Sequence, residues 1–438
     1  MTRVPAVSPR RRDEIIAALR RGTVPANGLD QLAVGLDRFQ GALAEDLDAV
    51  AAGGFAIKAV RGEYGSGKTF FTRHLAEQAL RRGFAAAEVQ ISETETPLHR
   101  LETIYRRIAE SLRTASIPPS AFRPVLDSWI YTVEEDAISA EPELAENPEA
   151  LGAATSALMD RRLTAISASN PAFAQALRGY HRATGTDPAT ADALAAWLAG
   201  QPHVAAAAKR DAGVKGDLDH FGAMSFLQGL LTVLRDAGHP GLILVLDEVE
   251  TLQRMRSDTR DKALNALRQL MDEIDAGRYP GLYLVLTGTP AFYDGPSGVP
   301  RLPPLAQRLA TDFTTDARFD NPRAVQIRLP GFTTDALTEV GKRVRDLYAA
   351  GRPSAPRLER LADDTYIADL ARAVAGGLGE RTGIAPRLFL KKLVGDILDR
   401  IDQFEDFDPR KHYQPTIGAH DVGQDGPRTD PDSIELDV

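Results

Sequence analysis

The sequence predicts an α/β protein with a parallel five-stranded sheet, a helical insertion and a C-terminal group of helices. Three observations favour this class. Residues 62–69 form a glycine-rich turn between a strand pattern and a helix pattern. Residues 242–246 and 283–286 are runs of consecutive apolar residues, typical of strands buried on both faces of a sheet. Residues 92–240 are rich in alanine and in helical spacing and show no central strand, which indicates an insertion.

The glycine-rich turn has the composition of a phosphate-binding loop. Its residues fit the pattern G-x-x-x-x-G-K-[ST] at every fixed position, and the alternative is a chance glycine-rich turn. Glycines let several backbone N–H groups point at one anion, and the following helix adds the positive end of its dipole. We expect Lys68 to reach the β- and γ-phosphates of a nucleotide and Thr69 to ligate Mg²⁺. The predicted nucleotide contacts are Gly62, Glu63, Tyr64, Gly65, Ser66, Gly67, Lys68, Thr69 and Phe70.

Two acids end the apolar run that begins at Leu242. The carboxyl ends of parallel strands form the sheet edge where ligands bind. We therefore expect Asp247 to hold Mg²⁺ and Glu248 to orient and deprotonate the attacking water. The alternative is a strand that simply stops at polar residues. The next buried strand ends at Thr287 and Thr289, and either hydroxyl could touch the γ-phosphate or the water, or merely cap the turn.

Composition restricts the class of protein further. The chain has 438 residues, of which 43% are hydrophobic and 26% charged, as in ordinary soluble proteins. It has no cysteine, which excludes disulfides and thiolate chemistry, and its N-terminus has no apolar signal segment, so we expect a cytoplasmic protein without membrane contact. The net charge of −9 argues against a broad nucleic-acid surface. The eight histidines form no metal-binding pair, so no metal beyond the Mg²⁺ of the nucleotide is predicted.

The pattern along the chain predicts four regions. Residues 1–36 form a basic leader, a short helix from Asp13 and a loop that could lie against the adenine base or merely connect. Residues 37–332 form the nucleotide-binding domain, with the helical insertion at about 92–222. Residues 333–405 form a helical domain, and residues 406–438 an acidic, extended tail.

Two expectations concern the insertion. The acidic stretch Glu134 to Glu149 contains two prolines, so it is interpreted as a solvated loop. Trp129 and Trp197 are expected in the core.

With these features the chain resembles the AAA+ P-loop ATPases, especially their initiator-like branch. The helical domain then corresponds to an α-helical lid. Gly383-Ile384-Ala385-Pro386-Arg387 is similar to the G-x-x-P-R element of that lid, which implies that Arg387 senses the γ-phosphate. A surface arginine at a helix start is the alternative.

A narrower likeness is to the ATP-binding proteins of bacterial BREX phage-defence loci, over about residues 13 to 415. The segments that carry it are GTVP at 22–25, GL at 28–29, VG at 34–35, RGEYGSGKTFF at 61–71, LDEVETLQR at 246–254 and EDFDPRKHYQ at 405–414.

The resemblance implies an ATPase that uses Mg²⁺-ATP to drive assembly or remodelling of a DNA-acting defence complex with other defence proteins. It also implies a homo-oligomer in which an arginine of one subunit completes its neighbour's site. Arg308 is predicted for that role, with Arg301 behind it. One alternative is a nucleotide-dependent switch or scaffold with little hydrolysis.

Another alternative is an ATP-regulated DNA-binding protein that uses Arg254, Arg256 and Arg260. The competing interpretation is an ordinary exposed helix, in which these arginines pair with Asp258 and Asp261 of the same chain.

Overall fold

The computed structural model describes residues 7–164, 170–378 and 385–415. The chain divides into two compact units. The first unit comprises residues 1–42, 60–77 and 312–438, and the second comprises residues 43–59 and 78–311. Among the described helices, none combines the length and the apolar character needed to cross a membrane.

One five-stranded parallel sheet organises the fold, as the sequence predicts. Its strand order is β2-β3-β4-β1-β5, and the register of the first three strands aligns Ala85 with Leu242 and Leu242 with Leu282. Every residue of β3 and β4 is buried, because helices cover both faces of a parallel sheet. The strands are β1 (Ala56–Arg61), β2 (Ala85–Gln90), β3 (Leu242–Asp247), β4 (Leu282–Gly288) and β5 (Gln326–Arg328).

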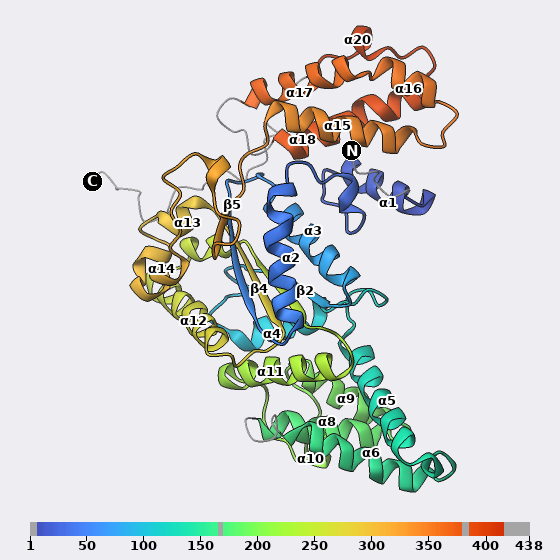
Figure 1. Cartoon of the computed structure of the whole chain (residues 1–438), viewed down its shortest axis with the longest axis vertical. Helices are drawn as coiled ribbons and strands as arrows, with labels where there is room; N and C mark the ends of the chain where they lie inside the picture. Colours follow the sequence, from blue (N-terminus) through green and yellow to red (C-terminus); the bar gives the residue numbers. More distant parts are fainter. Residues whose placement is uncertain (1–6, 165–169, 379–384, 416–438) are drawn as a thin grey trace, which may run out of the picture. The chain divides into compact units, whose positions relative to one another are not determined.

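The second unit adds a large set of helices. The described residues between β2 and β3 contain no further strand of the sheet, and Figure 1 shows α5, α6 and α8 to α10 gathered beyond α11. Trp129 and Trp197 are buried, as predicted. The helices of this unit are α4 (Leu101–Ser111), α5 (Phe122–Ala140), α6 (Pro148–Arg162), α8 (Pro171–Ala183), α9 (Pro188–Leu198), α10 (Ala206–Asp211), α11 (His220–Asp236), α12 (Ser257–Asp275), α13 (Pro290–Asp294) and α14 (Pro303–Leu309).

The acidic stretch of the insertion is mostly exposed to solvent, as predicted, but it is not one loop, because its first residues are helical. Helix α5 continues to Ala140, and a 3₁₀ turn at Pro142–Glu146 leads directly into α6. Val133 and Ala137 are buried on α5 at helical spacing, while the acids occupy its exposed side. The prolines stand at helix starts, where their missing N–H groups cost nothing.

The first unit has its own apolar core, to which helix α1 (Pro9–Arg20) contributes Ile15, Ile16 and Leu19. The helix begins at Pro9 and not at Asp13, because the Ser8 side chain accepts a hydrogen bond from the Arg11 N–H. The other elements are η1 (Leu29–Gln31), α15 (Thr334–Ala349), α16 (Ala355–Leu361), α17 (Asp364–Leu378), α18 (Ala385–Lys392), a π-helix (Leu393–Leu398), α19 (Asp399–Gln403) and α20 (Pro409–His412).

The described part of the predicted tail is folded. The Arg410 Nη2 atom donates to both oxygens of the Asp363 carboxylate, each at 2.8 Å. The Tyr413 hydroxyl donates to the Asp396 carboxylate at 2.8 Å. Residues 406–415 are therefore not extended, because α20 and the buried Phe407 attach them to the helical core. Residues 416–438 lie outside the described residues.

Helices α2 (Asp37–Ala51) and α3 (Lys68–Arg81) flank strand β1 in the sequence. Within the second unit, the Lys58 ammonium of β1 is buried and pairs with Asp46 of α2 at 3.0 Å. The same carboxylate accepts a hydrogen bond from the Tyr283 hydroxyl of β4 at 2.8 Å. Burial, and then the negative charge of Asp46, raise the pKa of Tyr283. This contact gives the buried lysine a negatively charged partner.

Candidate functional site

The loop between β1 and α3 has a backbone shape that requires glycine. Gly65 and Gly67 have φ values of 75° and 92°, in the region that side chains disfavour. A Cβ atom at Gly62 would lie 2.3 Å from the Ser66 Oγ atom. The sequence analysis named all three glycines as part of the loop. A side chain at Gly62 would enter the space that the turn encloses, next to Ser66.

Lys68 begins α3 and folds back over this loop. Its Nζ atom donates hydrogen bonds to the carbonyls of Gly62 at 2.8 Å and Glu63 at 3.2 Å. The side chain is 7% exposed, and the Tyr64 ring centroid lies 5.3 Å from the ammonium. A buried cation, glycine-shaped backbone and a helix N-terminus are the donor set that a polyphosphate needs, so these residues fit that ligand. Thr69 follows directly, and Phe70 stacks on His74.

The segment before α2 is attached to the helix that follows the loop. The Glu77 carboxylate of α3 accepts hydrogen bonds from the N–H groups of Gly28 and Leu29, both at 2.9 Å. Arg73 donates to the Val24 carbonyl at 3.4 Å. Sequence reasoning missed Glu77, although an acid on the helix after a phosphate loop and a glycine-containing loop upstream were both visible. The contact orders the predicted adenine-side loop against α3.

Three side chains near this contact could each offer a metal ligand. One ligand atom each from Asp30, His74 and Glu77 lie within 4.8 Å of one another. Both oxygens of Glu77 already accept backbone hydrogen bonds. The group therefore serves to hold the loop.

The acidic end of β3 is organised by β4. Asp247 is 5% exposed and accepts a hydrogen bond from the hydroxyl of Thr287, which is fully buried. The same hydroxyl accepts a hydrogen bond from the Glu248 N–H at 3.0 Å. Thr287 thus connects both predicted acids within the second unit. Thr289 is also buried, at the start of α13, and makes no side-chain cap there.

Glu248 has a strained backbone and a specific partner. Its φ and ψ values of 59° and 43° are left-handed, which is uncommon for a residue with a side chain. The turn ends β3 abruptly and starts the 3₁₀ helix η3 (Val249–Arg254). The Gln90 amide, at the end of β2, donates to the Glu248 carboxylate at 3.0 Å. Sequence reasoning missed Gln90, whose only signal was a polar residue ending a strand.

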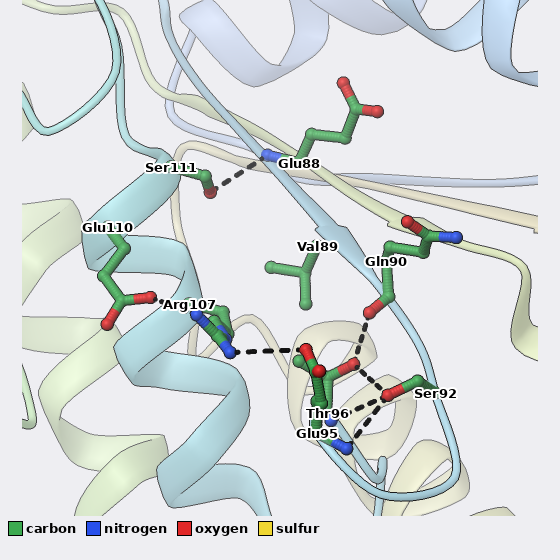
Figure 2. A pocket seen from close by; sticks show the side chains of 9 residues that line it. All are labelled: Glu88, Val89, Gln90, Ser92, Glu95, Thr96, Arg107, Glu110 and Ser111. Carbon is green, nitrogen blue, oxygen red and sulfur yellow. Dashed lines mark hydrogen bonds and ion pairs between the residues drawn. The ribbon is translucent and has the colours of Figure 1, made fainter.

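Gln90 also borders a cleft of about 360 Å³ beside β2 and α4 (Figure 2). In this cleft Ser92 and Thr96 hydrogen-bond to each other, and the Arg107 guanidinium pairs with Glu110 at 2.8 Å. The cleft is lined by Glu88, Val89, Gln90, Ser92, Glu95, Thr96, Arg107, Glu110 and Ser111. Its polar groups largely satisfy one another.

Arg387 lies on α18 in the first unit. Its Nε atom donates to the Gly22 carbonyl at 2.5 Å. Residues 383 and 384 of the G-x-x-P-R element lie outside the described residues. The structure therefore brings the predicted sensor arginine to the segment that precedes the phosphate loop.

The two arginines predicted to act on a neighbouring subunit are held by acids of α12. Arg308 of α14 pairs with Asp272 at 2.5 Å and with Asp275. Arg301 pairs with Asp261 at 2.9 Å. Neither side chain could leave this unit without breaking its ion pair.

The parallel five-stranded sheet and the glycine-shaped loop are those of an α/β protein compatible with a P-loop NTPase. The chain belongs to the family of BREX system ATP-binding proteins BrxC/D, whose family model matches residues 7–417. ATP binding in phage defence is thus the family's role, as the resemblance implies. Comparison with curated proteins gave no match.

Proposed function

We propose that the chain is an AAA+ ATPase that hydrolyses ATP to drive assembly or remodelling of a DNA-acting defence complex. The observation that carries this proposal is the loop itself. Lys68 presents a buried ammonium over a turn shaped by Gly62, Gly65 and Gly67. The residues Gly62 to Phe70 would surround the phosphates of ATP, and membership of an ATP-binding family supports that ligand.

The acidic strand end supplies the second part of the proposed site. Strands β1 and β3 belong to one sheet, so we propose that Lys68 and Asp247 serve the same nucleotide. Thr69 and Asp247 would hold Mg²⁺, which neutralises phosphate charge when bound. Thr287 keeps the Asp247 carboxylate oriented through its hydroxyl. Glu248 would orient the attacking water and accept its proton.

Arginines would complete the proposed site. Arg387 would contact the γ-phosphate from the helical lid once it leaves the Gly22 carbonyl. Arg308, with Arg301 as the second choice, would reach a neighbouring subunit of a homo-oligomer. The ion pairs of Arg308 with Asp272 and Asp275 would have to open first.

One observation favours a second candidate, a nucleotide-dependent switch or scaffold with little hydrolysis. The Gln90 amide donates to the Glu248 carboxylate at 3.0 Å, so one oxygen of the proposed base is already engaged by the protein. A carboxylate held in this way would have to exchange that contact for one with the attacking water. In this reading ATP fixes the shape of the protein and turnover is incidental.

Calorimetric titration with ATP and Mg²⁺, followed by steady-state measurement of phosphate release, tests the proposal. We expect saturable binding and turnover that is abolished when Mg²⁺ is chelated. Binding without turnover, in the presence of DNA and of other proteins of the defence system, would favour the switch. The absence of any ATP binding would overturn both candidates.

A further inference from the structure

Exposed, unpaired cations gather on the segments that follow β2 and β3. Arg100 ends the segment after β2, Arg254 and Arg256 lie at the end of η3 and the start of α12, and Lys262 lies on α12. All four side chains are exposed. Within the part of the chain that the structure describes, none of them forms an ion pair or a side-chain hydrogen bond. These four residues are called the basic surface.

The two segments of the basic surface lie next to each other. The Thr251 hydroxyl of η3 donates to the Ile91 carbonyl at 3.3 Å, which joins η3 to the segment after β2. His99 on that segment has its pKa lowered, first by burial and then by the positive charges of Arg100 and Lys262. Glu102 and Asp258 act in the opposite direction but leave the net shift downward. Arg100 and Lys262, one on each segment, therefore both act on His99.

Two other arginines of this region, Arg301 and Arg260, do have partners. The lack of partners is therefore specific to the four residues of the basic surface. Asp261 of α12 binds Arg301 and is not a partner of Arg254 or Arg256. The alternative that Arg254, Arg256 and Arg260 pair with Asp258 and Asp261 holds only in part. The hydrogen bond from Arg301 and, to a smaller extent, the positive charge of Arg260 lower the pKa of Asp261, whereas within the described residues no ion pair or hydrogen bond joins Asp258 to any of the three arginines. Arg260, which the sequence grouped with them, instead turns back and donates to the Met255 carbonyl at 3.0 Å. Unneutralised cations on a chain of net charge −9 suit a polyanionic partner.

We propose that the basic surface, Arg100, Arg254, Arg256 and Lys262, binds the phosphate backbone of a nucleic-acid duplex. Arginine and lysine contacts to phosphate supply sequence-independent affinity. The apolar residues of η3 and its end, Leu252 and Met255, are buried, so the surface lacks the apolar centre of a protein interface. Interfaces with nucleic acid are instead polar and positively charged. The proposal does not depend on ATP hydrolysis.

Binding of a fluorescent duplex to the full chain, measured over a series of salt concentrations, tests the proposal. The double variant Arg254→Gln with Arg256→Gln should lower the slope of log affinity against log salt by about 2, because each arginine that no longer meets a phosphate lowers it by about 1. The matched control is Arg161→Gln with Arg210→Gln, which removes equal charge from exposed arginines of α6 and α10. We expect the control to keep the slope of the natural chain. Thermal unfolding verifies that each variant is folded.

The titration is run with a DNA duplex and with an RNA duplex of the same sequence. Tighter binding of one duplex identifies which nucleic acid supplies the phosphate backbone. Three results would overturn the proposal: no duplex binding by the natural chain, equal slopes for both double variants, or competition by a polyglutamate peptide as effective as competition by duplex. ATP affinity is measured in parallel. Loss of duplex binding with unchanged ATP affinity would separate this surface from the nucleotide site.

Discussion

The phosphate loop and the acidic strand ends become ordered in different ways. Lys68 donates to carbonyls that lie six and five residues away in the sequence. Thr287 and Gln90 reach Asp247 and Glu248 from 40 and 158 residues away. The loop is thus a local structure, whereas the acids depend on neighbouring strands being paired. A substitution in the loop should change ligand binding, and one beneath the acids should change stability as well.

The largest expected effect is that of Glu248→Gln. If Glu248 is the general base, turnover falls by about 10²–10⁴-fold while ATP binding is kept, because glutamine cannot accept the proton. Phosphate release and calorimetric ATP titration measure the two quantities. Glu93→Gln, at an exposed acid of the segment after β2, is the control and should retain turnover. Full turnover in Glu248→Gln would assign the base elsewhere.

Lys68→Ala tests the local half of the comparison. Removal of one charged hydrogen-bond donor should weaken ATP binding by about 10- to 100-fold, equivalent to about 1.5–3 kcal/mol. Calorimetry measures the affinity, and Lys411→Ala, at an exposed lysine of α20, is the control. An unchanged affinity would show that the loop does not contact the phosphates.

Thr287→Val tests the half that depends on tertiary contacts. Valine leaves the buried Asp247 carboxylate and the Glu248 N–H without that hydroxyl, so the free energy of unfolding should fall by about 1–3 kcal/mol. Urea unfolding measures this change. Thr289→Val is the matched control, because Thr289 is also buried and forms no side-chain hydrogen bond within the described residues. Equal destabilisation of both variants would contradict the role of the Thr287 hydroxyl, and Thr287→Ser should restore stability.

The smallest expected effect is that of Arg387→Gln. The side chain is exposed and donates one hydrogen bond, to the Gly22 carbonyl. Because a single hydrogen bond contributes about 1 kcal/mol, we expect the substitution to lower the affinity for ATP by about fivefold. Arg360→Gln, at another exposed arginine of the first unit, provides the comparison in the same titration. If both variants bind ATP like the natural chain, Arg387 is a surface residue at a helix start.

Sequence patterns predicted the two central strands β3 and β4 well because each carries a continuous apolar run. The acidic end of α5 was wrongly predicted as a loop, since charge and proline suggested solvent while the buried Val133 and Ala137 continued the helix. Residues 333–405 were predicted as helical, but the pattern did not indicate that a π-helix at Leu393–Leu398 follows α18.

By itself the sequence determined the glycine-rich loop and the acids at the end of β3, because a turn and a strand end are set by consecutive residues. Only the tertiary structure decided which side chains hold them. Gln90 meets Glu248, Thr287 meets Asp247, and Glu77 meets Gly28 across long separations in the chain. Such pairs arise from strand order and helix packing, which bring together residues whose spacing carries no periodic signal. The same reason explains why Arg100 and Lys262 joined Arg254 and Arg256 in the basic surface only once the structure connected the segments after β2 and β3.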